Sequence, residues 1–420
     1  MGSIRICGAA VLEPSGLKKK ELWIRDGVFV QPDPKETPDE TIDAAGLVAA
    51  PGLVDLHVHL RDPGQTEKED LVSGCRAAAA GGVTSLLAMP NTRPAMDSPE
   101  VLRAFLSRAA QQKIHVYQAS AATKGLFSEN CCDLAAMQAA GARAVSDDGF
   151  PVKTADCMRR TLLEAARLGL PVFAHCEDPA LMGGKMNAGA LAEALGVPGM
   201  PEAAEENGIA RDLALAEELQ VPLHLCHVST RGSVALIRKA KARGVRVTAE
   251  TAPHYFSLDE SLLSKRDADY RMNPPLRTKA DVLAVIEGLC DGTLDAIATD
   301  HAPHAPAEKA DFLGAPNGSI GMETSLAAGL TFLVEPGHLT LAELLEKMSR
   351  NPARILGIPA GTLSPGAPAD LVLFDPKARN TVDPARFHGK SRNCPFKGMT
   401  LSGRVRMTIA GGTVVYRPTL

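Results

Sequence analysis

Between residues 50 and 330 one pattern repeats: a short apolar run ends in polar residues, a helix-like stretch follows, and another apolar run begins. The apolar runs lie at residues 53–60, 83–91, 114–122, 142–149, 171–178, 222–230, 246–255 and 294–304. Segments between them, such as 98–112 and 155–169, carry apolar residues at helical spacing. Eight strand-plus-helix units of this kind predict an α/β fold, a (β/α)8 TIM-type barrel.

An open, doubly wound sheet is the alternative interpretation of the same pattern. Such a sheet typically carries a glycine-rich phosphate turn after its first strand, and no such turn follows residues 53–60. Polar residues also follow nearly every apolar run. A closed barrel explains this better, because all of its strand ends converge on one mouth.

The two ends of the chain differ from the repeat. Residues 1–49 contain short β-like runs with Asp-Gly and proline-rich turns. Residues 359–420 also contain short β-like runs separated by turns. Neither piece is long enough to make a good sheet alone. We therefore expect one small β-sandwich formed by both ends, flanking a barrel over residues 50–358.

Composition excludes several classes of protein. The formal net charge of −4 argues against a surface that binds nucleic acid or an acidic membrane. No stretch approaches the roughly 18 apolar residues of a membrane span, and the N-terminus shows no export pattern. Nine cysteines without a CxxC pair indicate free thiols rather than a disulfide framework. We expect a reduced, cytoplasmic protein.

His57-Val58-His59 is the sharpest local signal for chemistry. Residues two apart on a strand share a face, so both imidazoles can reach one point inside the barrel. The plainer alternative is a strand with one solvent-facing side, but the run LVDLHVHL is otherwise apolar. Buried polar side chains need partners, and a divalent metal satisfies imidazole lone pairs. The pair therefore predicts a metal site.

Further candidate ligands follow the later strands. His175 and His227 end the fifth and sixth apolar runs; each alone would more often be structural, but both lie at the same mouth as the first pair. Asp300 closes the eighth run and can ligate a metal and accept a proton from water. Its alternative role as a helix N-cap is weakened by the prolines at 303 and 306. Imidazoles and a carboxylate suit zinc or a similar first-row metal.

Four other histidines receive a structural interpretation. His224 lies three residues before His227 and should point the other way. His115 sits early in the third run, near the bottom of the expected barrel. His338 and His388 fall outside the strand ends.

Asp147 and Asp148 end the fourth apolar run as an acidic doublet. Consecutive side chains on a strand point to opposite faces, so at most one of them can face the barrel mouth. Strand alternation alone leaves open which one it is.

Eight motifs together resemble the dihydroorotases, and most closely the long-chain bacterial type within the amidohydrolase superfamily. They are HVHLRDPG (57–64), MPNT (89–92), SDDG (146–149), AHCED (174–178), CHVST (226–230), ETAPHYF (250–256), MNPPLR (272–277) and TDHAPH (299–304). An HxH pair is shared across the superfamily, whereas this ordered set is far more specific. The resemblance runs from about residue 45 to the C-terminus.

The resemblance implies reversible cyclisation of N-carbamoyl-L-aspartate to L-dihydroorotate plus water, in de novo pyrimidine (UMP) biosynthesis. In the hydrolytic direction a metal-bound hydroxide attacks the ring amide, and Asp300 shuttles the proton to the leaving nitrogen. The resemblance implies one or two Zn²⁺ ions per subunit. The implied ligands are His57, His59, Asp148, His175, His227 and Asp300.

In this type an aspartate replaces the carboxylated lysine that bridges the metals of many superfamily members. The fourth run contains no lysine, and the 27-residue interval from Asp148 to His175 agrees with the spacing of this type. The resemblance therefore assigns Asp148 to the metals. We expect Asp147 to point away and to cap backbone amides at the turn.

The resemblance also implies a set of substrate-binding residues, some of which offer donors for a substrate carboxylate. The matching positions are His59, Arg61, Asn91, Asn273, His304, Asn317 and Gly318. We expect the segment 301–318 to act as a lid over the mouth.

Two alternative functions stay open. A hydantoinase-like or allantoinase-like cyclic-amide hydrolase is disfavoured by Arg61, Asn91 and Asn273, and by the missing lysine. A non-catalytic dihydroorotase-like scaffold of aspartate carbamoyltransferase is disfavoured because such relatives tend to lose metal ligands, and this chain keeps each one. We expect a homodimer, with aspartate carbamoyltransferase as a partner, and no binding to nucleic acid or membrane.

Overall fold

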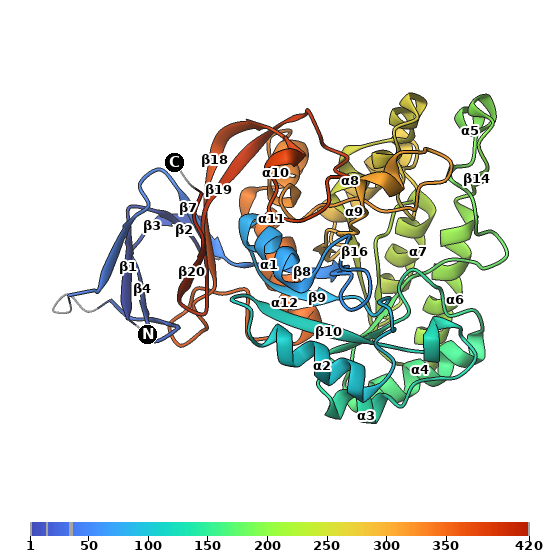
Figure 1. The fold of residues 1–420 in the computed structure, drawn as a ribbon, viewed down its shortest axis with the longest axis horizontal. Helices are drawn as coiled ribbons and strands as arrows, with labels where there is room; N and C mark the ends of the chain where they lie inside the picture. Colours follow the sequence, from blue (N-terminus) through green and yellow to red (C-terminus); the bar gives the residue numbers. More distant parts are fainter. Residues whose placement is uncertain (1, 14–15, 33–36, 419–420) are drawn as a thin grey trace.

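A barrel of eight parallel strands forms the larger part of the molecule, shown at the right of Figure 1. The computed structural model describes residues 2–13, 16–32 and 37–418. In sheet order the strands are β8 (Leu53–Val58), β9 (Val83–Ala88), β10 (His115–Ala121), β11 (Ala144–Ser146), β12 (Val172–Ala174), β15 (Leu223–Leu225), β16 (Val247–Thr251) and β17 (Ala296–Ile297). The ring is joined beyond β17, where the His59 amide donates to the His301 carbonyl at 2.8 Å. The predicted barrel is confirmed.

A helix follows each of the first seven strands. In order these are α1 (Leu71–Ala80), α2 (Pro99–Ala109), α3 (Leu134–Ala139), α4 (Ala155–Leu168), α6 (Ala203–Leu219), α7 (Arg231–Ala242) and α9 (Lys279–Cys290). Polar residues at the ends of the preceding loops start several of these helices, because their side chains accept a hydrogen bond from the backbone amide three residues later. These N-caps are Asp70, Ser98, Thr154, Thr230 and Thr278.

Helices after β17 complete the barrel. They are α10 (Ser325–Gly329), which continues into the π-helix η5 (Leu330–Val334), α11 (Leu341–Leu345), which continues into the π-helix η6 (Glu346–Arg350), and α12 (Asn351–Leu356). α12 packs on β8 and β17 and joins a buried cluster with Val54, Leu56 and Phe173. This apolar cluster closes the barrel at the amino ends of the strands, so the carboxyl ends form the open mouth.

Short elements interrupt two of the strand-to-helix connections at that mouth. Between β12 and α6 lie β13 (Met186–Asn187), α5 (Ala190–Leu195) and β14 (Gly199–Met200). Between β16 and α9 lie α8 (Pro253–Ser257), η2 (Glu260–Lys265) and η3 (Ala268–Tyr270), and η4 (Pro306–Lys309) and η1 (Lys124–Leu126) lie in two further loops. The two insertions share a second hydrophobic cluster, so they form a continuous wall above the barrel.

Both ends of the chain meet in a β-sandwich beside the barrel, at the left of Figure 1. One sheet has the order β5 (Val28–Val30), β4 (Leu22–Arg25), β1 (Ser3–Cys7) and β6 (Glu40–Asp43). The other has the order β20 (Thr413–Tyr416), β19 (Thr400–Ala410), β18 (Leu371–Thr381), β7 (Val48–Pro51), β2 (Ala10–Glu13) and β3 (Gly16–Lys19). Because β18 pairs with β7, the two chain ends are hydrogen-bonded to each other.

A shared core holds the two sheets together. Ile6 and Phe29 from the first sheet and Leu371 and Ile409 from the second belong to one buried cluster. The predicted sandwich formed by both ends is thus confirmed, whereas the boundaries at 49/50 and 358/359 stay predictions. Residues 1, 14–15, 33–36 and 419–420 of the predicted sandwich lie outside the described ranges. Among the described residues, no helix has the length and apolar character needed to cross a bilayer.

Candidate metal centre and its cavity

Six side chains from five strands converge at the mouth of the barrel, and each is less than a tenth exposed. They are the six ligands expected from the sequence, namely His57, His59, Asp148, His175, His227 and Asp300. Four imidazole nitrogens face the Asp148 carboxylate, at 3.1 Å for His57 Nε2, 3.3 Å for His59 Nε2, 3.4 Å for His175 Nδ1 and 3.3 Å for His227 Nε2. Oδ1 of Asp300 lies 3.2 Å from His59 Nε2 and 3.6 Å from His57 Nε2.

This arrangement fits a divalent metal. His57 Nε2 is buried and lies 3.1 Å from Asp148 Oδ1, but it forms no hydrogen bond with any residue that the structure describes. His175 Nδ1 and His227 Nε2 lie only 2.9 Å apart, so two imidazole nitrogens point at the same place. The ligand atoms of His57, His59 and Asp300 lie within 4.8 Å of one another. The donor set of imidazoles and carboxylates is that of zinc and similar first-row metals.

Three of the imidazoles have an acceptor on the ring nitrogen that faces away from the cluster. Nδ1 of His57 lies 3.0 Å from Glu250 Oε1, Nδ1 of His59 lies 2.8 Å from Asn91 Oδ1, and Nε2 of His175 lies 3.1 Å from Glu177 Oε2. Each acceptor holds the N–H on the outer nitrogen, so the inner nitrogen presents its lone pair to the cluster.

The sequence analysis did not single out Glu177 and Glu250. Glu177 lies two residues after His175, a spacing that could have suggested it. Glu250 lies on β16, and its second carboxylate oxygen lies 3.1 Å from His224 Nε2. His224 therefore faces the barrel interior, and the expectation that it points the other way is wrong. The backbone of His227 has a φ of 37°, which breaks the two-residue alternation on which that expectation depended.

The acidic doublet splits between the cluster and the neighbouring turn. Asp147 accepts hydrogen bonds from the backbone amides of Ala122 (2.7 Å) and Thr123 (3.0 Å) and from the Thr123 hydroxyl. Burial raises the pKa of Asp147 to about 7 in spite of these donors. Burial acts on Asp148 in the same direction, but the surrounding imidazoles, His57 first among them, hold its pKa well below its usual range. Asp148 is therefore an ionised carboxylate at the centre of the cluster.

Three of the predicted site residues have a left-handed backbone conformation that residues other than glycine rarely adopt. The φ angles are 57° for Arg61, 37° for His227 and 47° for Asp300. Such strain persists only where the surrounding structure imposes it, and it concentrates at functional sites. Here it aims a guanidinium, an imidazole and a carboxylate into the mouth.

A cavity of about 730 Å³ opens over the cluster. His57 lies beneath its floor, and the other predicted site residues line it, namely His59, Arg61, Asn91, Asp148, His175, His227, Asn273, Asp300, His304, Asn317 and Gly318. The volume is typical of a small-molecule site. The structure thus brings every site residue expected from the sequence to one place.

Arg61 is a buried cation with free donors. Its Nε donates to the Pro303 carbonyl at 3.2 Å, and its two terminal nitrogens bond to no residue in the described part of the chain. Burial lowers the pKa of Arg61 to about 10, although the nearby Asp300 and Asp148 carboxylates act in the opposite direction and raise it. Arg61 therefore stays charged at neutral pH. Asn273 donates through Nδ2 to Glu177 Oε2 at 3.2 Å.

His304, Asn317 and Gly318 form one wall of the cavity. His304 Nε2 donates to the Asn317 carbonyl at 2.8 Å, and burial lowers the pKa of His304 to about 2, so its ring is neutral. Gly318 has a φ of 136°, and a Cβ there would lie 2.8 Å from Ala302 Cβ and 2.9 Å from His304 Nε2. Only glycine fits this position without moving the wall.

Asn393, which the sequence analysis missed, positions this wall from the C-terminal part of the chain. Its Nδ2 donates to the carbonyls of Ala302 (3.1 Å) and Gly318 (3.0 Å), and its Oδ1 accepts from the His304 amide at 3.2 Å. Nothing in the local sequence marks Asn393, because all three partners are at least 75 residues away in the chain.

The segment 301–318 is closely tied to the rest of the mouth. Lys309 Nζ donates to the carbonyls of Ala268 (3.0 Å), Arg271 (3.2 Å) and Pro316 (2.8 Å). Nη2 of Arg271 donates to Asn317 Oδ1 at 2.9 Å. The structure thus shows one anchored position of this segment, and its movement as a lid stays a prediction.

The chain is similar in sequence to a known family and to several known proteins. Residues 48–415 match the model of the amidohydrolase family. The dihydroorotase of Geobacter metallireducens is 51% identical over 90% of both chains. The dihydroorotase of Pelotomaculum thermopropionicum is 47% identical over 98% of this chain and 97% of its own.

Solved structures with the same architecture include the L-hydantoinase (dihydropyrimidinase) from Arthrobacter aurescens. Its TM-score is 0.90 at 26% identity, over 99% of this chain and 96% of that one. The dihydropyrimidinase from Brevibacillus agri NCHU1002 reaches a TM-score of 0.87 at 25% identity, over 99% of this chain and 95% of its own.

Proposed function

The chain belongs to the amidohydrolase family and, within it, to the dihydroorotases, and we propose that it interconverts N-carbamoyl-L-aspartate and L-dihydroorotate plus water in pyrimidine biosynthesis. The observation that carries this proposal is the cavity over the buried histidine–aspartate cluster, with the free donors of Arg61 at its side. Relatives named dihydroorotase at 45–51% identity support the same reaction.

We assign one or two zinc ions to the cluster. His57, His59 and Asp300 would hold one ion, and His175 and His227 the other, with Asp148 between them. Nε2 of His57, which faces two carboxylates and has no hydrogen bond among the described residues, supports this assignment. When bound, the metal supplies a Lewis acid that polarises the amide carbonyl and makes water a better nucleophile near neutral pH.

Arg61, Asn91 and Asn273 bind the substrate. The terminal nitrogens of Arg61 donate to a substrate carboxylate, because a guanidinium matches two carboxylate oxygens with two parallel hydrogen bonds. Asn91 Oδ1 accepts from His59, so the asparagine also orients a metal ligand. The amide side chains and the Asn317–Gly318 backbone complete the cavity around the polar ring of dihydroorotate.

Asp300 moves the proton. Burial by itself raises its pKa, but the hydrogen bond and charge of the histidines beside it lower the pKa of Asp300 to about 2. Its carboxylate is therefore ionised at neutral pH and accepts the proton of the attacking water. It then delivers this proton to the leaving ring nitrogen, and ring closure uses the same group in the opposite order.

A paired assay tests the proposal. Hydrolysis of dihydroorotate and cyclisation of N-carbamoyl-L-aspartate are measured on the purified protein, with its metal counted before and after chelation. Both rates should fall as metal is removed and return when zinc is added. Normal rates without metal would contradict the proposed site.

A hydantoinase-type activity is the second candidate, because the solved structures named above include hydantoinases with TM-scores up to 0.90. The absence of lysine from β11 and from Ser146–Gly149 disfavours it, as does the higher identity to dihydroorotases. Faster turnover of hydantoin or allantoin than of dihydroorotate would favour this candidate. A chain without bound zinc, and without activity after zinc addition, would instead indicate a scaffold.

We further propose a cytoplasmic homodimer that associates with aspartate carbamoyltransferase. All nine cysteines are free thiols in the structure, which supports a reducing compartment. Size-exclusion chromatography of the protein alone and mixed with an aspartate carbamoyltransferase tests both interactions.

A further inference from the structure

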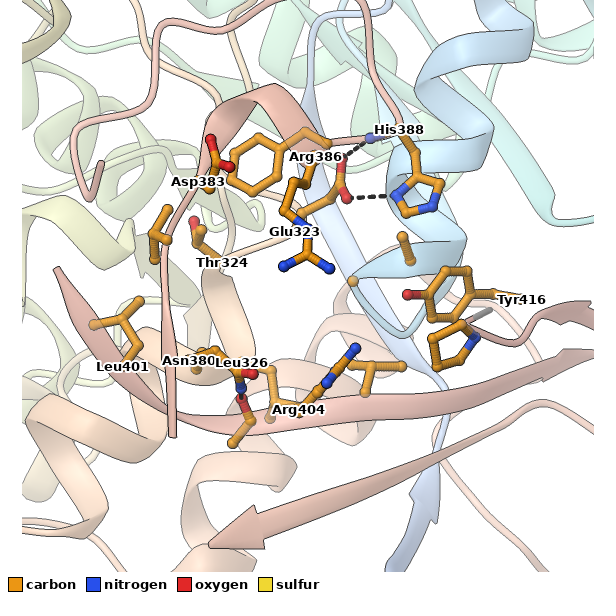
Figure 2. Close-up of a pocket in the computed structure, with 18 of the residues that line it drawn as sticks. Glu323, Thr324, Leu326, Asn380, Asp383, Arg386, His388, Leu401, Arg404 and Tyr416 are labelled. Carbon is orange, nitrogen blue, oxygen red and sulfur yellow. Dashed lines mark hydrogen bonds and ion pairs between the residues drawn. The ribbon is translucent and has the colours of Figure 1, made fainter. Parts of the chain in front are cut away.

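A second cavity, of about 830 Å³, lies away from the metal centre, where the terminal strands meet the barrel (Figure 2). Its walls come from β18, β19 and β20, from the start of α10, and from the loop residues 382–388. It shares no residue with the lining of the first cavity. The proposed reaction therefore does not explain it.

Four arginines line this cavity, and two of them lack partners. Arg379 and Arg417 pair with glutamates, at 3.4 Å and 3.2 Å. The side chains of Arg386 and Arg404 form no hydrogen bond or ion pair with any residue in the described part of the chain. Figure 2 shows their guanidinium groups pointing into the same space, Arg386 from the loop and Arg404 from β19.

The acidic groups in the wall form no ion pair with these two arginines in the described part of the chain. Glu323 accepts from the His388 backbone amide at 2.7 Å, and its other oxygen lies 2.8 Å from His388 Nδ1. Asp383 accepts from the Ala385 amide at 3.0 Å. Both carboxylates bind the loop, and neither forms an ion pair with Arg386 or Arg404, so the two guanidinium groups share the cavity without a direct anionic partner among the described residues. Like charges that face the same space repel, and a bound anion would relieve this repulsion.

An aromatic and apolar surface adjoins the two arginines. The half-buried Tyr416 turns its hydroxyl toward them in Figure 2. Leu326 and Leu401 are buried in the same wall, and Val405 and Val415 are half-buried. Such a surface binds the face of a flat ring and tolerates differences in its substituents.

We propose that this cavity binds a nucleoside monophosphate. Its phosphate lies between Arg386 and Arg404, whose guanidinium forks match phosphate oxygens with paired hydrogen bonds. Its ring rests against Tyr416 and the apolar wall. A phosphate dianion matches two guanidinium groups better than a single carboxylate does, and the volume is sufficient for a mononucleotide. This inference goes beyond the proposed reaction and does not depend on it.

Isothermal titration calorimetry of the full-length, zinc-loaded protein tests the site. Uridine monophosphate should bind saturably, and uridine and inorganic phosphate should each bind at least about tenfold more weakly. Arg386→Ala and Arg404→Ala should each weaken uridine monophosphate by about tenfold or more. Arg103→Ala, an exposed arginine on α2, is the matched control and should change nothing.

Three results would overturn the proposal. They are the absence of saturable binding up to about 10 mM, an affinity that neither arginine variant alters, and tighter binding of inorganic phosphate than of the nucleotide. If a second copy covered the cavity, the two variants would change the elution volume in size exclusion instead of the affinity, and this would also overturn it. Unchanged circular dichroism and unchanged dihydroorotate hydrolysis in both variants show that a loss of binding is local.

Discussion

Glu250 Oε1 lies 3.0 Å from Nδ1 of His57, although the two residues are 193 positions apart in the chain. Both side chains are fully buried. The carboxylate holds the His57 N–H on the outer nitrogen, so that Nε2 faces Asp148 and Asp300. A buried glutamate therefore decides which atom His57 offers to a metal.

Glu250→Gln should weaken zinc binding by about 10- to 100-fold, because the imidazole loses a charged acceptor. A competition titration with a chromophoric chelator measures the affinity. Glu218→Gln, which removes an exposed partner of Arg159, is the control and should leave the affinity unchanged. Equal affinities in both variants would show that Glu250 does not support the metal site.

The two members of the acidic doublet should respond differently to the same substitution. Asp148→Asn should lose metal and reduce turnover by at least about 100-fold, because its carboxylate faces four imidazole nitrogens. Asp147→Asn should keep its metal but lose about 1–3 kcal/mol of stability, because it weakens buried hydrogen bonds to Ala122 and Thr123. Metal analysis and urea unfolding measure the two effects. If Asp147→Asn lost its metal and Asp148→Asn kept it, Asp147 would be the metal ligand instead.

Gly318→Ala should lower kcat/KM by about 10- to 100-fold, because its Cβ would displace His304 and Ala302 from the cavity wall. Gly366→Ala is the matched control, since Gly366 also has a positive φ (87°) and a Cβ there meets nothing within 4 Å. Its backbone strain should cost about 1–2 kcal/mol of stability, but its kinetics should be normal. Equal kinetics in the two variants would argue against a binding role for this wall.

Asn393→Ala should raise KM by about tenfold with unchanged zinc content, because it frees the backbone that carries His304 and Gly318. Asn351→Ala is the control: it loses a side-chain hydrogen bond to the Asp295 carbonyl, at the closed end of the barrel. Steady-state kinetics and metal analysis on both variants check this prediction. A loss of zinc in Asn393→Ala would mean that the wall also supports the metal site.

The contact between His115 and Asp370 should make stability depend on pH. His115 Nε2 lies 3.1 Å from Asp370 Oδ1, and this bond raises the pKa of His115 above 6.5 against the effect of burial. A raised folded-state pKa means that the bond stabilises fully below about pH 6.5 and is lost as the pH rises through the raised value. Because the side chain is 40% exposed, the effect should stay below about 1 kcal/mol.

Urea unfolding of the native protein and His115→Gln tests this sign. The variant should be less stable at pH 6 and equal to the native protein at pH 9. A deficit of the same size at both values would show that the loss comes from packing instead of the charged bond.

The barrel could be predicted because its signal is local. Each strand and helix carries its own periodicity, and each polar residue at a strand end lies at the mouth once eight parallel strands close. For this reason His57, His59, His175, His227 and Asp300 could be expected at one site. The sandwich could be expected because neither chain end has enough strands to form a core alone.

The sequence by itself therefore determined the architecture and the position of the candidate ligands along it. Only the tertiary structure decided the direction of His224, because a left-handed residue at His227 breaks the strand alternation. It also decided that Glu250 and Asn393 support the site, and that Arg386 and Arg404 face each other across a second cavity. These relationships join residues far apart in the chain, so they exist only after the barrel has closed and the C-terminal strands have packed against it.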